Sequence, residues 1–155
     1  MPRYLTPHFT LDELVASQTA ARRGIDNTPP PDVLRNLQRL AQVLEEVRTR
    51  LGGLPLLISS GYRCPALNRA VKGAPNSLHM QGLAVDFTVP RFGTVLQTAR
   101  AVAASGIAFN PVIHEFGSWV HLGLAPDGQP PAGEKLSIFT GTGYLSGLVG
   151  QPRLA

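Results

Sequence analysis

The stretch Ser77-Leu-His-Met-Gln-Gly-Leu-Ala-Val-Asp86 places an imidazole, His79, and a carboxylate, Asp86, seven residues apart, with Gly82 between them. A second imidazole, His121, follows later in the chain. Two histidines and one carboxylate are a ligand set that zinc enzymes use while a fourth position stays open for water. If these three side chains converge, the sequence predicts a metallohydrolase.

The second half of this stretch alternates in the manner of a β-strand. Between Gly82 and Val89, Asp86 shares one face with the small residue Ala84 and with Thr88, and apolar side chains take the other face. Asp86 is therefore expected opposite the core. The small side chain of Ala84 leaves room for a ligand to reach it.

Two further strands are predicted at residues 111–116 and 119–124, joined by a turn at Gly117-Ser118. In the second of these strands, Trp119 and His121 lie on the face opposite to three core residues. An unpaired carboxylate in an apolar strand is costly, and a divalent cation would offset that cost. A metal site is therefore favoured over three independent structural residues, with Zn²⁺ first by ligand type.

The rest of the chain predicts a mixture of helices and short strands. Apolar periodicity, caps and Gly/Pro positions indicate helices at residues 11–17, 33–51, 65–71 and 93–105, and strands at 54–60, 82–89 and 135–140. The Gly-rich segment from residue 141 onward gives no clear pattern. We expect one α+β domain over residues 1–155, with a small antiparallel sheet that carries the ligands on one face and helices packed on the other.

Composition narrows the function classes. The chain has 155 residues, 43% hydrophobic and 15% charged, which is not a disordered composition. It has neither an apolar run of membrane-spanning length nor the apolar segment of a secretory signal, so we expect synthesis in the cytoplasm without a signal peptide. The net charge of +4 is spread without a dense basic run. This argues against nucleic-acid binding and suits an anionic polymer such as cell wall. We expect a monomer.

The pattern Ser77-x-His79-x-x-Gly82-x-Ala84-x-Asp86, followed by Trp119-Val-His121, resembles the signature of the zinc D-Ala-D-Ala carboxypeptidase family of metallopeptidases. That family includes D-alanyl-D-alanine dipeptidases and phage endolysins that cleave L-alanyl-D-glutamate bonds. The segments 59–68 and 9–14 also resemble it, so the similarity spans about residues 9–124 and leaves 125–155 as a C-terminal extension.

The resemblance implies a hedgehog/DD-peptidase-like zinc peptidase fold with His79, Asp86 and His121 as zinc ligands. It implies a hydrolase acting on peptidoglycan stem peptides, with no organic cofactor, which would reach the cell wall after phage-type release. Glu115 would be the general base, and Arg63 would hold the substrate carboxylate or the developing oxyanion. The residues proposed to contact substrate are Ser77, Arg63, Trp119 and His114.

One position departs from the family pattern. In better-known members the catalytic Glu lies three residues before the last His, where this chain has Ser118, whereas Glu115 lies six residues before His121. A three-residue turn would pair Glu115 with His121 directly. A two-residue turn would instead pair His114 with His121 and turn Glu115 to the other face.

Two questions stay open on the sequence alone. His114 could orient a water, stabilise an oxyanion, support a ligand, or be a plain strand residue. The alternative function is a non-catalytic zinc-binding module on the same fold, either a wall-binding or a phage structural component. The position of Glu115 relative to the metal distinguishes that alternative from an enzyme.

Overall fold

The computed structural model describes residues 2–153. Within this range the helices are α1 (Leu11–Val15), α2 (Gln18–Arg23), α3 (Pro31–Arg50), α4 (Pro65–Ala70), α5 (Val95–Ala103) and the short 3-10 helix η1 (Leu78–Gln81). The strands are β1 (Tyr4–Thr6), β2 (Phe9–Thr10), β3 (Leu57–Ser60), β4 (Ala84–Thr88), β5 (Val112–Glu115), β6 (Trp119–Gly123), β7 (Lys135–Phe139) and β8 (Gly143–Ser146). The elements predicted from periodicity are present, and β1, β2, α2, η1 and β8 are additions.

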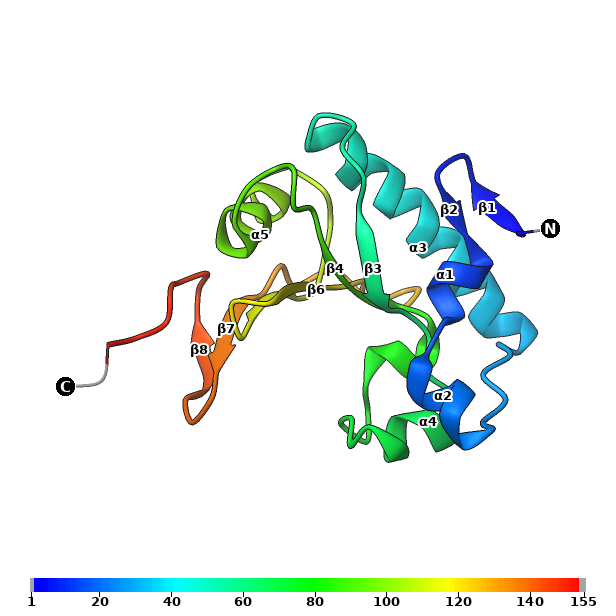
Figure 1. Cartoon of the computed structure of the whole chain (residues 1–155). Coiled ribbons are helices and arrows are strands. Elements are labelled where there is room, and N and C mark those ends of the chain that lie inside the picture. The colour runs from blue at the N-terminus through cyan, green and yellow to red at the C-terminus, as the bar shows by residue number, and fades with distance from the viewer. Residues whose placement is uncertain (1, 154–155) are drawn as a thin grey trace.

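The larger sheet contains six strands in the order β3-β4-β6-β5-β7-β8. Figure 1 shows β3 near α3 and β8 toward the C-terminal end of the molecule. The α+β class is confirmed. The expectation of an antiparallel sheet holds for four of the five strand pairings in this sheet and is wrong for the fifth, because β5 and β7 run parallel. The segment between β6 and β7 carries the chain past β5, so that β7 enters beside β5 in the same direction. A separate two-stranded sheet pairs β1 with β2 near the N-terminus.

Helices α3 and α5 pack against one face of the six-stranded sheet, which we call the back face. Helix α3 begins with Pro31, whose fixed φ and missing N–H suit the first turn of a helix. Its apolar stripe is fully buried, in agreement with the sequence pattern. The core shared by these helices and the back face includes Leu37, Leu40, Leu44, Val85, Phe87, Ala99, Val102, Val120 and Leu122.

Strand register decides which side chains share the other face, which we call the ligand face. Asp86 pairs with His121 between β4 and β6, and Glu115 pairs with Trp119 between β5 and β6. Residues that pair directly across neighbouring strands project to the same side. Asp86, His121, Trp119 and Glu115 therefore lie on one face, opposite the helices.

The C-terminal segment completes the back face. After β8, the carbonyl of Gly147 accepts a hydrogen bond from Ser137 Oγ at 2.8 Å, and the carbonyl of Leu148 accepts from Arg100 of α5 at 3.0 Å. Val149 adds two contacts, one to Ser137 and one to His114. Residues 147–149 thus join β5, β7 and α5.

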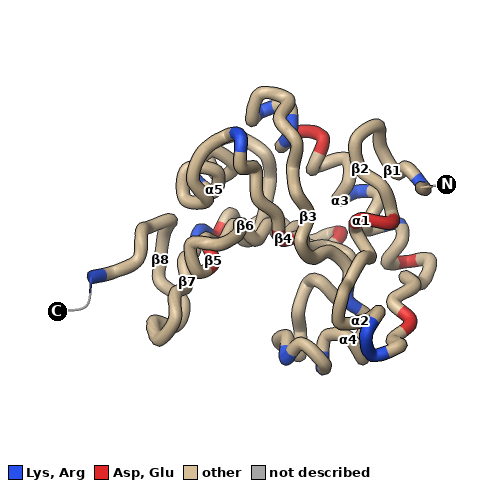
Figure 2. The backbone as a smooth tube through the Cα atoms, in the orientation of Figure 1, with Lys and Arg blue, Asp and Glu red and all other residues tan. Residues whose placement is uncertain are grey.

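Charged residues are dispersed over many elements rather than gathered on one of them (Figure 2). This distribution agrees with the scattered basic residues of the sequence. In the part of the chain that the figure colours, no helix carries a continuous row of basic residues. Among residues 2–153, none of the helices combines the length and the apolar character needed to cross a bilayer.

Candidate metal centre

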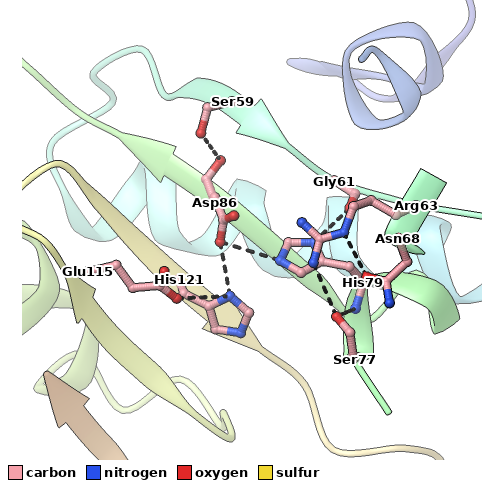
Figure 3. Close-up of polar contacts among 9 residues, drawn as sticks. All are labelled: Ser59, Gly61, Arg63, Asn68, Ser77, His79, Asp86, Glu115 and His121. Atoms are coloured by element: carbon pink, nitrogen blue, oxygen red, sulfur yellow. Dashed lines mark hydrogen bonds and ion pairs between the residues drawn. The ribbon is translucent and has the colours of Figure 1, made fainter. Parts of the chain in front are cut away.

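Three side chains converge on the ligand face. One potential ligand atom each from His79, Asp86 and His121 lies within 4.8 Å of the other two. The Oδ1 atom of Asp86 is 3.5 Å from His79 Nε2 and 2.9 Å from His121 Nδ1. Figure 3 shows the two rings directed toward the carboxylate from η1 and β6. We call these three residues the ligand group.

The local backbone delivers each member of the ligand group differently. Asp86 and His121 are direct cross-strand partners on β4 and β6, so the sheet itself sets their separation. His79 lies on η1, which ends at Gly82 with φ +71°. A Cβ at Gly82 would approach Val33 and Leu37 of α3 to 3.0 and 3.1 Å, so both the turn and the packing favour glycine.

A hydrogen bond from Nδ1 of His79 fixes the orientation of its ring. His79 Nδ1–H donates to the carbonyl of Gly61 at 2.7 Å, and Nε2, the other ring nitrogen, faces Asp86 Oδ1 at 3.5 Å. Metal-binding histidines characteristically donate their other ring N–H in this way. Gly61 is itself held close to α1, because a Cβ there would overlap the carbonyl of Leu14. The imidazole of His79 is therefore oriented by the path of the chain at the end of β3.

The electrostatics of Asp86 favour a charged carboxylate. Burial raises its pKa, but hydrogen bonds from His121 and His79, together with their charge, lower it well below the ordinary value. A buried anion with two imidazoles directed at it fits a cation. Two nitrogen donors, one oxygen donor and an oriented histidine are the ligand chemistry of zinc sites that keep an open position.

Glu115 lies beside the ligand group. Its Oε1 atom is 3.8 Å from His121 Nδ1, and both side chains are on the ligand face. Neither register considered from the sequence occurs. The loop has three residues, Phe116 to Ser118, but Glu115 pairs with Trp119 and His121 pairs with Ile113. Left-handed conformations at Phe116 (φ 56°) and Gly117 (φ 65°) turn the chain earlier than expected.

The surroundings of Glu115 disfavour its charged form. Burial raises its pKa, and the negative charge of Asp86 raises it further, against opposing contributions from His121, the Trp119 indole and Arg63. Trp119 Nε1 is buried and has no hydrogen-bond partner among the described residues. The indole N–H therefore influences the carboxylate without a hydrogen bond of acceptable geometry to it.

Arg63 lies on the other side of the ligand group from Glu115 (Figure 3). Its Nε donates to Asn68 Oδ1 at 3.2 Å and its Nη2 donates to Ser77 Oγ at 3.3 Å. Ser77 also accepts from the backbone N–H of His79 and caps η1. The guanidinium is partly desolvated, which lowers its pKa, while the charges of Asp86 and Glu115 raise it. Arg63 and Ser77 thus sit together next to the ligands.

His114 is not brought to the ligand group. It pairs with Val120 on the back face, because alternation places it opposite to its neighbour Glu115. Its Nδ1–H donates to the carbonyl of Val149 at 3.0 Å, and its ring packs edge-on against Phe139. The expected substrate contact by His114 is therefore replaced by packing within the fold.

Two supporting residues were missed from the sequence. Asn68 is buried and holds Arg63, while its Nδ2 donates to the carbonyl of Ala74 at 2.9 Å. Asn27 binds the loop after β3, donating to the carbonyl of Tyr62 and accepting from the N–H of Cys64. A polar Asn in the short helix after Arg63 was a usable signal for Asn68. Asn27, in a Pro-rich loop distant in sequence, offered none.

Comparison with protein-family models gives a match over residues 7–123 to the model described as Peptidase M15. The matched range contains the ligand group, Arg63, Ser77 and Glu115, and ends at the last residue of β6. A search of curated proteins found no match. M15 peptidases depend on zinc, and the ligand group could hold such an ion. Since the matched segment covers well over half of the chain, the chain belongs to the Peptidase M15 family of metallopeptidases.

Proposed function

We propose that this protein is a zinc-dependent peptidase that hydrolyses bonds in peptidoglycan stem peptides, either as a D-Ala-D-Ala carboxypeptidase or as an L-Ala-D-Glu endopeptidase. The observation that carries the proposal is the position of Glu115. Its carboxylate lies 3.8 Å from a nitrogen of His121, on the same face as the ligand group. A binding module would not need a second carboxylate at this place.

His79 Nε2, Asp86 Oδ1 and His121 Nδ1 would hold the zinc ion. When bound in such a site, zinc lowers the pKa of a coordinated water and polarises a carbonyl group. Holding the ion costs the protein little rearrangement, because the three donor atoms already converge and the His79 ring is oriented by Gly61.

Glu115 would accept the proton of the attacking water and pass it to the leaving amine. A general base must lie within reach of the proton it takes and have a pKa near the working pH. Glu115 meets the first condition by its place beside His121, and burial raises its pKa toward the second.

Arg63 would bind the carboxylate of the residue that follows the scissile bond. A guanidinium presents paired donors that match a carboxylate, and Asn68 and Ser77 hold this one in place. Both candidate bonds, D-Ala-D-Ala and L-Ala-D-Glu, are followed by a residue with a carboxylate. The net charge of +4 further favours an anionic polymer such as the cell wall. We propose that the protein reaches the wall by phage-type release.

The proposal is tested by incubating zinc-loaded protein with purified muropeptides and identifying products by mass spectrometry. We expect one defined cleavage, lost on chelation and restored by added Zn²⁺. The Glu115→Gln variant should bind one zinc per chain as the wild type does, yet lose about 10²–10⁴-fold in kcat, because the base is gone while the ligands remain.

Glu134→Gln is the matched control for the charge change, since Glu134 is exposed and lies at the start of the β7 region. It should retain wild-type kcat. Stoichiometric zinc with no product from any stem peptide would overturn the enzyme and leave a zinc-binding module. Full activity in Glu115→Gln would remove Glu115 from the chemistry.

A further inference from the structure

A row of side chains on the ligand face continues from Glu115 to the C-terminal hairpin. Glu115 pairs with Ile138 of β7, and Ile138 pairs with Tyr144 of β8. Direct partners share a face, so Tyr144 projects on the same side as Glu115. Two strand spacings separate their backbones by ~10 Å. Tyr144 is 63% exposed, which leaves its ring available.

Two more aromatic residues flank Glu115. Trp119 is its cross-strand partner, and Phe116 follows it in the chain. The rings of Phe116 and Trp119 lie 5.7 Å apart. Phe116 has φ 56°, a left-handed conformation that is unfavourable for a non-glycine residue, and 42% of it is exposed. An exposed aromatic side chain in an unfavourable backbone conformation does not stabilise the fold. Such outliers often serve a binding site.

The two sides of the ligand group differ in chemistry. Arg63, Asn68 and Ser77 make the side formed by α4 and η1 cationic and polar. Phe116, Trp119 and Tyr144 make the opposite side aromatic. In both candidate bonds an alanine supplies the scissile carbonyl, and a residue with a carboxylate follows. An aromatic surface suits an alanine methyl group, and a guanidinium suits the carboxylate.

We propose that Tyr144, together with Phe116 and Trp119, forms an aromatic wall that receives the alanine before the scissile bond, and that Tyr144 is a specificity-determining residue. This inference rests on the proposed function and gives the substrate a direction, with its carboxylate toward Arg63 and its alanine toward β8. Tyr144 lies beyond residues 7–123, so a contact to substrate comes from the C-terminal extension rather than from the family-matched segment.

The electrostatics of Tyr144 agree with this placement. Partial loss of solvent around the phenol raises its pKa, and the negative charges of Glu115 and Asp86 raise the pKa further. The ring therefore lies within the field of the site although it is carried by β8.

The test compares Tyr144→Ala, Tyr144→Phe and the matched control Tyr4→Ala. Tyr4 is 62% exposed on β1, which belongs to the other sheet. The substrate is the stem peptide that the wild type hydrolyses. We expect Tyr144→Ala to raise KM roughly 3–10-fold at nearly unchanged kcat, because the lost contact stabilises the bound substrate and the transition state equally. Tyr144→Phe should stay within about twofold of the wild type, because the ring makes the contact. Tyr4→Ala should match the wild type.

A second substrate sharpens the test. Replacing the alanine before the scissile bond by glycine should raise KM for the wild type and leave it unchanged for Tyr144→Ala. Equal KM values for wild type and Tyr144→Ala on both peptides would overturn the aromatic wall while the peptidase stands. A loss of kcat and zinc in Tyr144→Ala would also overturn it, because that result indicates a structural role.

Binding measured without turnover separates the two proposals. Calorimetry with the zinc-loaded Glu115→Gln protein and the stem peptide should give a Kd that Tyr144→Ala weakens by the same factor as KM. Should the wild type cleave nothing, the proposed function fails. The proposed aromatic wall would then be tested by this Kd alone, and a Kd that is unchanged in Tyr144→Ala would overturn it.

Discussion

The two faces of the central strands both bury polar side chains, but they satisfy them in different ways. On the back face, His114 and Ser137 bond to backbone groups of Gly147 and Val149. On the ligand face, Asp86, His121 and Glu115 have mainly one another as neighbours. Buried polar groups with local backbone partners serve the fold. Converging lone pairs and two carboxylates, by contrast, favour a cation. Convergence, rather than burial, distinguishes the candidate site.

The largest expected effect comes from replacing each of the two buried histidines by alanine in separate variants. His79 and His114 are 3% and 4% exposed, so the pair is matched in burial. His79→Ala should abolish stoichiometric zinc binding and reduce peptidase activity to background, because one of three ligands is lost. His114→Ala should keep one zinc per chain and lose about 1–3 kcal/mol of unfolding free energy, since the Val149 carbonyl loses its donor.

Metal analysis and urea denaturation measure both quantities. A folded His114→Ala protein without zinc would contradict the prediction that zinc binding depends on the ligand face and not on the back face. A His79→Ala protein with full zinc would mean that His79 is not a ligand.

A smaller effect should follow from Gly61→Ala. The added Cβ would overlap the carbonyl of Leu14 and displace the carbonyl that orients His79. We expect a loss of about 1–3 kcal/mol in stability from overpacking. Zinc affinity should fall about 10–100-fold, as for other partners that orient a ligand. Competition with a chelating dye measures the affinity.

Gly150→Ala is the control, because a Cβ there meets nothing within 4 Å and its φ is not in the left-handed region. It should leave stability and zinc affinity unchanged. Wild-type zinc affinity in Gly61→Ala would show that the ligand face does not depend on the end of β3.

The smallest effect is expected for Ser137→Ala on the back face. Ser137 Oγ donates to the Gly147 carbonyl and accepts from the Val149 N–H. Its removal should cost about 1 kcal/mol in urea denaturation. Zinc content and kcat/KM should stay within about twofold of the wild type. A tenfold loss of kcat/KM in a stable Ser137→Ala protein would show that the back face affects activity, contrary to this prediction.

The ligand face was predictable where periodicity sets it. Alternation in β4 and β6 places Asp86 and His121 opposite the core, and the structure pairs them directly. The register of the β5–β6 hairpin was not predictable, because it depends on a left-handed conformation at Phe116, which an aromatic residue seldom adopts. The face of Glu115, and with it that of His114, follows from this one residue.

The C-terminal part of the sheet was harder to predict for two reasons. The connection between β6 and β7 has no periodic pattern, so nothing in it indicates a parallel pairing with β5. Strand β8 begins at Gly143 and is flanked by Gly141 and Gly147, all with positive φ, and Gly-rich sequence is typical of a loop. The contribution of Tyr144 to the ligand face was hidden for the same reason.

Strand β7 also has a consequence for the way the chain can be divided. The family match ends at residue 123, yet β5 is paired on its outer side by β7. A chain cut there would expose the N–H and C=O groups of β5 as a free edge, open to pairing with other molecules, and would uncover His114. The extension therefore covers the outer edge of β5 and moves the edge of the sheet to β8, so shortening the protein at the limit of family similarity would remove two strands of its sheet.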